Sequence, residues 1–414
     1  MAPTHYDPTS EQEKPVPLPS APAITISDNI VLQPPLSRRG TGPGLLIILP
    51  PNEDITPSTK PEKPLDPNPV TKWAEEGFAV VSAFSSEDLD INSTIDQALN
   101  AFDACPEVDI KNKFGVIVYD RSQIFAFSEA LENHPRVQAL VGYGSFSAPA
   151  SNVPTLLHLT ANAPRPRHPP NNLVKQHSYP ITSTHFVLPS SSEYEPNQAA
   201  IAHSRTLIFL RAQLGGPFFD LEAIWDEHCY FEFEMRSVAQ TMGTMVAEPY
   251  VNHVPTMTGG IGRKLLTEFY RDHFIFSNPA DARLETISRT IGADRVVDEF
   301  VYHITHDRVV DWLLPQVPPT GRVLAVPMMA VVNIRGDRLY NAEHIWWDQA
   351  TVLRQAGILP DMLPFTDPKH PREGPKMLRI PVAGIESALM LQDEMSGRSN
   401  DMFGPGWGIQ DSDA

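Results

Sequence analysis

The sequence predicts two folded domains, an α/β domain followed by an α+β domain. A chain of 414 residues exceeds the size of an ordinary single hydrophobic core. Strand-like and helix-like segments alternate between residues 44 and 216, an order typical of parallel strands joined by crossover helices. After Pro217 the helices come first and the long strands later. That order favours an antiparallel sheet behind a few helices, so we place the domains at residues 21–216 and 217–360.

The first domain follows a short polar segment. Residues 1–20 are rich in Pro, Ser, Glu and Thr, and we expect a disordered tail because they carry too little apolar surface to offset the entropy of ordering. Apolar runs then predict strands at residues 44–50, 78–84, 114–119, 137–144 and 155–160. Amphipathic runs predict helices at residues 70–77, 93–104, 124–133 and 197–215, the last ended by Gly215 and Gly216.

The second domain is expected to contain long strands. Helical spacing predicts helices at residues 219–235, 236–245 and 262–274. Strands are expected at residues 284–292, 295–307, 323–336 and 338–348, and a helix at residues 349–359. The remaining residues, 361–414, form a C-terminal tail with one short helical segment at residues 385–395.

Composition excludes several classes of protein. A formal net charge of -18 argues against a nucleic-acid partner, because binding to phosphates requires clustered Lys and Arg. The apolar runs are too short to span a bilayer, so no membrane segment is expected. The N-terminus has no secretory pattern, and the sequence predicts a soluble, cytoplasmic protein with Cys105 and Cys229 reduced.

A histidine segment in the first domain resembles a known hydrolase family. The segments SYPITSTHFVLP and YEPNQAAIAHSRTLIFL, with the strand and helix order, resemble the dienelactone hydrolase family of the α/β-hydrolase fold over roughly residues 44–216. The resemblance implies that His185 stands at the position of the catalytic histidine. The strand FGVIVY should lead into a nucleophile turn flanked by glycines, but Asp120 occupies the nucleophile position and no glycine flanks it.

Three interpretations of this residual hydrolase site stay open. The domain is a scaffold that has lost its activity, because a base without a nucleophile and an orienting acid does not complete acyl transfer. Alternatively, Asp120 is itself a carboxylate nucleophile and His185 activates water. In the third interpretation Ser122 acts from a shifted turn.

The run YNAEHIWWD at residues 340–348 suggests a catalytic site in the second domain. Strand alternation places Ala342, His344, Trp346 and Asp348 on one face. A carboxylate beside Trp346 loses hydration, which raises its proton affinity toward the range of a general base. The alternative is an edge strand whose polar side faces water.

Proton removal next to a carbonyl also requires a group that stabilises the charge on oxygen. His253 is the first candidate, and His344, on the same predicted face as Asp348, is the second. The expected substrate-binding residues are Tyr250, Asn252, Glu299, Tyr302 and Trp346. No metal site is expected, because His303 and His306 fall on opposite faces of a strand.

The second domain also resembles a known superfamily. The block EPYVNHVPTMTGGIGRKLLTEFYRDHF and the segment WWDQATVLRQAGIL are similar to the NTF2-like superfamily, in particular its SnoaL-like branch of polyketide cyclases and isomerases. The resemblance implies a conical half-barrel, an acid–base role for Asp348, a homodimer and a place in secondary or aromatic metabolism.

Together these observations predict a cofactor-independent acid–base enzyme, of the isomerase, dehydratase or cyclase type, that acts on a small apolar carbonyl compound. One alternative is a lactone or ester hydrolase that works through the first domain. Another is a non-catalytic protein that binds a small molecule or serves as a scaffold.

Overall fold

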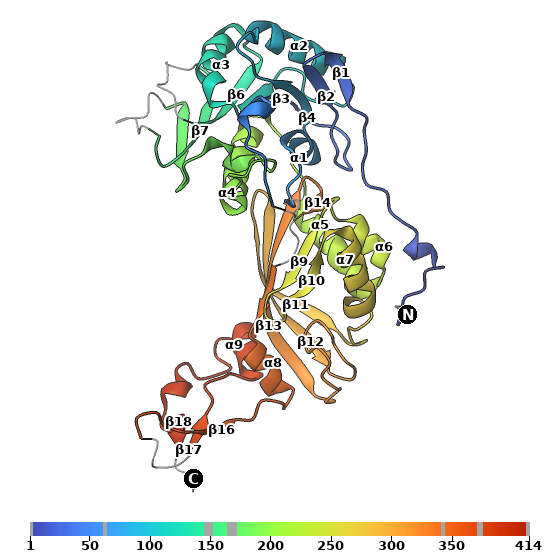
Figure 1. The fold of residues 1–414 in the computed structure, drawn as a ribbon. Coiled ribbons are helices and arrows are strands. Elements are labelled where there is room, and N and C mark those ends of the chain that lie inside the picture. The colour runs from blue at the N-terminus through green and yellow to red at the C-terminus, as the bar shows by residue number, and fades with distance from the viewer. Residues whose placement is uncertain are drawn as a thin grey trace. The chain divides into compact units, whose positions relative to one another are not determined.

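The computed structural model describes residues 3–60, 64–144, 152–163, 172–340, 344–370 and 376–410. The chain forms two compact units, each drawn from more than one segment (Figure 1). The N-terminal unit comprises Pro17–Leu221 and Arg335–Arg338. The C-terminal unit comprises Met1–Val16, Glu222–Ile334 and Leu339–Ala414.

The N-terminal unit is built on an eight-stranded sheet with the order β1-β2-β4-β3-β5-β6-β7-β8. Its strands are β1 (Ile24–Ser27), β2 (Ile30–Gln33), β3 (Gly44–Leu49), β4 (Ala79–Phe84), β5 (Phe114–Val118), β6 (Val137–Tyr143), β7 (Thr155–Leu159) and β8 (Val174–Ser178). Strands β3 to β8 pair in parallel, whereas β2 pairs antiparallel with both β1 and β4. The strands that the sequence predicts correspond to β3–β7 and pair in parallel, as expected, whereas β1 and β2, which the sequence does not predict, make the whole sheet mixed. The reason is the tight connection between β1 and β2, since a link of two residues joins only antiparallel strands.

Helices cover both faces of this sheet, as the alternating sequence pattern predicts. They are α1 (Pro69–Glu75), α2 (Ile91–Ala104), α3 (Ile124–Ala130) and α4 (Pro196–Leu214), with short turns η2 (Asn52–Asp54), η3 (Arg121–Gln123), η4 (Leu131–Asn133) and η5 (Thr184–Val187). Two apolar clusters form, one containing α2 and α3 and the other α1 and α4. Helix α4 ends at Gly215, whose positive φ of 81° confirms the predicted cap.

The C-terminal unit is built on a seven-stranded sheet with the order β10-β9-β15-β13-β12-β11, and β14 also pairs with β13. Its strands are β9 (Tyr250–His253), β10 (Thr258–Ile261), β11 (Arg283–Ile291), β12 (Arg295–Thr305), β13 (Val323–Arg335), β14 (Arg338–Leu339) and β15 (His344–Trp347). Strand β15 pairs in parallel with β9, and β9 and β10 form a hairpin that the sequence does not predict. In the described residues no sheet closes into a barrel.

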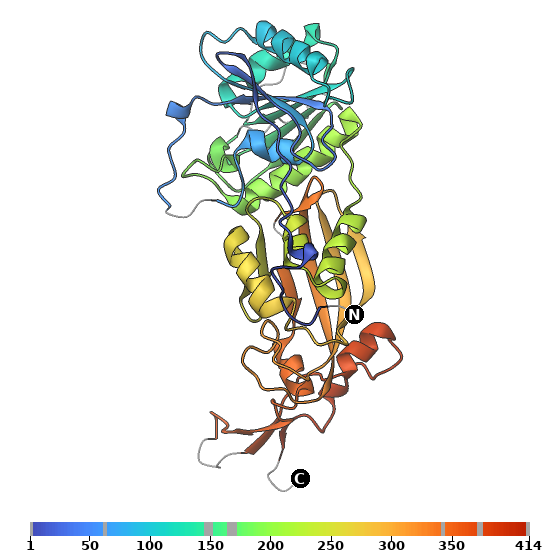
Figure 2. The ribbon, with the colours of Figure 1, turned by 90° about the vertical axis from the view of Figure 1, so that its right-hand side faces the viewer.

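Helices pack on one side of this sheet (Figures 1 and 2). They are α5 (Leu221–Cys229), which continues as the π-helical segment η6 (Tyr230–Glu234), then α6 (Val238–Gly243), and α7 (Gly262–Phe269), which continues as the π-helical segment η7 (Tyr270–Phe274). The predicted helix after β15 is confirmed as α8 (Gln349–Gln355). The C-terminal residues form β16 (Met362–Phe365), β17 (Lys376–Arg379), α9 (Glu386–Gln392), η9 (Asp401–Phe403) and β18 (Gly408–Gln410).

Residues 3–16, which the sequence assigns to a tail, make defined contacts inside the C-terminal unit. The turn η1 (Glu11–Glu13) brings the Glu13 carboxylate to the start of α6. There it accepts hydrogen bonds of 2.9 Å from the backbone N–H groups of Val238 and Ala239. These groups would otherwise lack partners in the helix, so the polar segment satisfies the first turn of α6.

The two faces of β12 differ in environment. Asp298, Phe300, Tyr302 and Ile304 are buried, while Glu299 is only partly buried. Because side chains alternate along a strand, the buried set points toward the helices and Glu299 points to the opposite face. The sequence leaves this choice of face open, and the structure decides it.

Candidate active site

A cavity of about 390 Å³ lies between the helices and the sheet of the C-terminal unit. Its volume falls in the range of small-molecule sites. The lining residues are Trp225, Asp226, Cys229, Tyr230, Glu232, Phe233, Glu234, His253, Phe274, Ala282, Arg283, Leu284, Thr286, Arg289, Asp298, Phe300, Tyr302, Trp312, Met328, Ala330 and Ile345. Aromatic side chains and charged or polar side chains both contribute to this wall.

His253 is a polar residue of the cavity wall with a nitrogen that has no hydrogen bond to the described residues. Its side chain is fully buried at the end of β9. Nδ1 lies 3.2 Å from the hydroxyl of Thr258, while Nε2 makes no hydrogen bond in the described part of the chain. Burial lowers the pKa of His253 to about 3, partly opposed by a hydrogen bond with the Thr258 backbone. The ring is therefore neutral at neutral pH.

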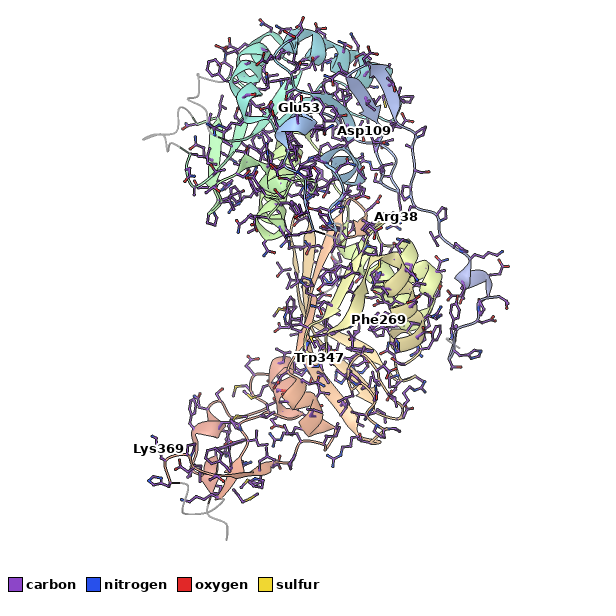
Figure 3. The ribbon with its side chains drawn as sticks, viewed as in Figure 1. Arg38, Glu53, Asp109, Phe269, Trp347 and Lys369 are labelled. Atoms are coloured by element: carbon purple, nitrogen blue, oxygen red, sulfur yellow. The ribbon has the colours of Figure 1, made fainter. Side chains whose placement is uncertain are left out.

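Four aromatic rings surround His253 and hold its plane. Phe274 stacks on it at 5.5 Å between ring centroids, and Trp312 lies at 4.9 Å. Phe269 lies at 5.5 Å and Trp347 at 5.9 Å; Figure 3 labels both. This enclosure explains the low pKa, because none of these rings replaces the water that would solvate an imidazolium ion.

A second polar group at the wall is Tyr302, which the sequence names as a substrate-binding residue. Its hydroxyl donates a hydrogen bond of 2.6 Å to Oδ1 of Asn278, which also accepts one of 3.0 Å from Nε1 of Trp312. Burial raises the pKa of Tyr302 well above its ordinary value. The phenol therefore stays protonated and holds the cavity wall in place.

The third polar group is Asp298, which is paired on both oxygens. Arg289 donates to Oδ1 at 2.7 Å and to Oδ2 at 2.8 Å, and Nε1 of Trp225 donates to Oδ2 at 2.8 Å. Hydrogen bonds to Asp298 raise the pKa of Arg289 further above its usual value. Donors from Arg289 and Trp225 therefore occupy both oxygens of this carboxylate.

A buried histidine and glutamate on the α5–η6 helix form another polar pair at the cavity. Glu232 lines the cavity and is almost fully buried, and Nε2 of His228 lies 3.1 Å from its Oε1. Neither residue is among those predicted from the sequence. Their signal is the spacing of Trp225, His228 and Glu232, which places all three on one face of a helix.

The predicted site residues separate into two groups. His253 and Tyr302 line the cavity, but Asp348 does not, and its side chain is exposed. The expectation of a desolvated Asp348 is therefore wrong. Its carboxylate caps α8 by accepting from the Ala350 N–H at 3.0 Å and the Thr351 hydroxyl at 2.7 Å. The physical reason is that the strand face shared by His344 and Trp346 points away from the cavity, and the chain leaves the sheet at Asp348 to begin α8.

The remaining predicted residues of the second domain do not line the cavity. In β15 the buried residues are Ile345 and Trp347, so His344 and Trp346 point to the opposite face of the sheet. The ring centroids of Tyr250 and Trp346 lie 5.4 and 5.7 Å from that of His344. The partly buried Asn252 pairs with His344 across the strands, and Glu299 accepts a hydrogen bond from Ser288. The predicted acid–base partnership of His344 is thus not formed at the cavity.

In the N-terminal unit, Asp120 and His185 are each engaged locally. The Asp120 carboxylate caps η3 and accepts hydrogen bonds from the hydroxyls of Ser85 at 2.5 Å and Ser122 at 2.8 Å. Nδ1 of His185 lies 3.7 Å from a carboxylate oxygen of Glu193. In the described residues no contact joins Asp120 to His185, and the residual hydrolase site stays a prediction.

The described residues contain neither a metal-binding cluster nor a membrane-spanning helix. Within residues 3–410, apart from the gaps given above, no group of three His, Cys, Asp or Glu side chains is arranged to hold a metal ion. In the same residues, no helix combines the length and the apolar character that a membrane crossing requires.

Solved structures provide a likeness of fold. A protein from Catenulispora acidiphila with a ketosteroid isomerase-like fold is 14% identical, with a TM-score of 0.26, over 33% of this chain and 93% of its own. A candidate SnoaL-like polyketide cyclase from Jannaschia is 15% identical, with a TM-score of 0.27, over 35% of this chain and 99% of its own. An NTF2-like protein of unknown function from Burkholderia pseudomallei is 15% identical, with a TM-score of 0.26, over 33% of this chain and 95% of its own. No family model and no curated protein matches the chain.

Proposed function

We propose that the C-terminal unit is a cofactor-independent acid–base enzyme that acts on a compact, mostly apolar carbonyl compound. The observation that supports this most is His253, a neutral and fully buried histidine that lines a cavity of about 390 Å³ and whose Nε2 has no hydrogen bond in the described residues. A buried polar atom without a partner is costly in a folded protein, so such an atom at a cavity wall suggests that a ligand supplies the partner.

A neutral imidazole is suited to contact a carbonyl oxygen. In the tautomer with a proton on Nε2, His253 donates a hydrogen bond to the oxygen. Nδ1 then accepts from the Thr258 hydroxyl at 3.2 Å, in place of the 3.3 Å hydrogen bond of that hydroxyl to the carbonyl oxygen of Trp312, to which the Thr256 hydroxyl donates at 2.8 Å. When the proton next to the carbonyl is removed, charge develops on that oxygen and the hydrogen bond becomes stronger. Because the pKa is about 3, His253 remains neutral throughout the neutral pH range and serves as a donor without first losing a proton.

The walls of the cavity suggest the class of substrate. Trp225, Phe233, Phe300 and Trp312 offer flat apolar faces. The cationic side chain of Arg289 is engaged by Asp298, Asp226 and Glu222. With its charge already balanced in this way, Arg289 gives little attraction to an anion, and we infer an uncharged, ring-containing substrate.

The proposal is tested by deuterium exchange. Compact cyclic ketones, with 2-tetralone as the first probe, are incubated with the full-length protein in heavy water, and deuterium at the carbons next to the carbonyl is followed by proton NMR. We expect exchange well above the buffer rate. His253→Gln should lower the exchange rate by about a hundredfold, in the range of losses seen when one donor to a developing oxyanion is removed.

His303→Gln is the matched control, because His303 lies on the opposite face of β12 and its ring bonds to Glu285. The wild-type rate is expected for it. If ketones raise the thermal unfolding temperature but none exchanges faster than in buffer, the cavity binds without catalysis. If exchange persists in His253→Gln, the chemistry lies elsewhere.

A further inference from the structure

The hydrogen bonds around His228 show which of its two ring nitrogens carries a proton. The Thr244 hydroxyl donates to the carbonyl oxygen of Thr241 at 2.7 Å, and it has only one proton to give. The same hydroxyl oxygen lies 2.6 Å from Nδ1 of His228. The hydroxyl therefore accepts there, and Nδ1 carries a proton.

The other ring nitrogen then faces a carboxyl group. Nε2 of His228 lies 3.1 Å from Oε1 of Glu232, closer than the Tyr270 hydroxyl at 3.4 Å. With Nδ1 protonated, a neutral ring would present a lone pair at Nε2, and a carboxylate would present another opposite it. Two lone pairs at this distance repel each other, which favours a proton between the two atoms.

We propose that His228 and Glu232 share this proton and that Glu232 is the acid–base residue that exchanges protons with the molecule bound in the cavity. Glu232 is the member that lines the cavity, whereas His228 is fully buried behind it and acts as a positioning residue. The inference rests on the proposed function, and it supplies the proton acceptor that the exposed Asp348 does not provide.

The surroundings of the pair suit this role. Glu232 lies in the π-helical segment η6 and Tyr270 opens the π-helical segment η7. Single π-helical turns occur often at functional sites, because they displace side chains from the regular helical positions. The ring of Trp225 stacks on His228 with 5.7 Å between centroids and 17° between planes, which fixes the imidazole.

Glu232, His228 and His253 together account for every proton and electron pair that moves in the proposed step. The C–H bond next to the substrate carbonyl breaks, and its electron pair forms a carbon–carbon double bond while the carbonyl π electrons move to oxygen. Glu232 takes the proton, the shared proton settles on Nε2 of His228, and His253 donates a hydrogen bond to the oxygen. Return of the proton to another carbon gives an isomer, and no oxidant or reductant is required.

The shared proton is tested first, without any ligand. In full-length protein labelled with nitrogen-15 at histidine, His228→Gln identifies the signals of His228 among the fourteen histidines. We expect Nδ1 to be protonated and the proton at Nε2 to be strongly shifted downfield. That downfield proton should disappear in Glu232→Gln, where an amide replaces the carboxyl group. An unprotonated Nδ1, or signals that Glu232→Gln leaves unchanged, would overturn the pairing.

The catalytic role is tested with a ketone that the wild-type protein exchanges. We expect Glu232→Gln to lower the exchange rate by a hundredfold or more, typical of losing a general base, with little change in KM. His228→Gln should lower kcat and alter its pH profile while KM again changes little. Glu268→Gln, the same chemical change on α7 outside the cavity lining, should retain the wild-type rate.

The outcomes separate the two proposals. If the wild type exchanges and Glu232→Gln, folded by its thermal unfolding curve, exchanges equally fast, Glu232 is not the base although the proposed function stands. If the wild type exchanges no ketone, the proposed function fails, and with it the role of Glu232 in proton exchange. The NMR spectra then decide only whether His228 and Glu232 share a proton.

Discussion

A buried neutral histidine links the stability of the C-terminal unit to pH. The unfolded chain takes up a proton at His253 near pH 6.5, whereas burial lowers the pKa of the folded form to about 3. Between these values the unfolded state binds more protons than the folded state. The contribution of His253 is therefore complete above pH 6.5 and is lost progressively as the pH falls toward 3.

We predict that His253→Gln makes the unit less sensitive to acid. From pH 7 to pH 5 the wild type should lose about 2 kcal/mol of unfolding free energy through this residue, and the variant should not. Urea unfolding followed by tryptophan fluorescence measures the difference, since five of the six tryptophans, all except Trp73, lie in this unit. His273→Gln, at an exposed position, is the control. An equal acid loss in wild type and His253→Gln would contradict the assigned pKa.

His253 and Asp348 show how far the position of a single side chain can be predicted from the sequence. His253 precedes a turn and lies among apolar residues, and its neighbour Val251 is buried on the same face of β9. Asp348 follows an equally apolar run but is the first residue beyond it. Alternation indicates which residues share a face, and it gives neither the face that is buried nor the residue at which the strand ends.

At the scale of the element, Asp348 acts as the N-cap of α8. Its carboxylate accepts a hydrogen bond from the backbone of Ala350 and another from the Thr351 side chain. We predict that Asp348→Ala lowers the unfolding free energy by about 1 kcal/mol. Asp348→Asn, which keeps an oxygen acceptor, should lose less, and urea unfolding at pH 7 ranks the two. A folded Asp348→Asn protein that has lost ketone exchange would instead place the chemistry at this helix start.

The outer face of the C-terminal sheet was least accessible to sequence reasoning. Helix α9, predicted only as a short helical segment, places Ala388 against Val301 and Ala325 on that face. Beside them Met329 and Trp346 pair across β13 and β15 and remain exposed. A contact between segments so distant in the chain leaves no periodic signal. The homodimer that the family resemblance implies stays a prediction.

At the scale of the whole molecule, neither unit is a continuous segment of chain. The sequence places the boundary near Pro217, and the first unit extends to Leu221 but also includes Arg335–Arg338. This short turn between β13 and β14 carries Gly336 at a φ of 59°, and a Cβ there would lie 2.1 Å from the backbone oxygen of Glu75. Hydrophobic periodicity describes residues that are close in the sequence, so it does not predict that residues 335–338 belong to the N-terminal unit.

Arg335 connects the inserted turn to the N-terminal unit through ion pairs, whose contribution to stability can be measured. Its buried guanidinium lies 2.6 Å from Asp66 and 2.7 Å from Glu75. Removing one partner of a buried ion pair leaves an uncompensated charge, although Asp66 keeps its contact with Lys72 at 2.6 Å. We predict that Arg335→Met destabilises the unit by about 2 to 3 kcal/mol, below the usual cost for an isolated buried pair.

Native-state hydrogen exchange of the buried amides in β3, β4 and β5, read by mass spectrometry, isolates this effect from the C-terminal unit. Arg39→Met is the matched control, because Arg39 is exposed and its side chain pairs with Asp109 at the surface. It should cost less than about 1 kcal/mol. Equal protection of these amides in wild type and Arg335→Met would mean that the N-terminal unit is stable without the inserted turn. A loss confined to Arg335→Met would show that residues far apart in the sequence complete a single core.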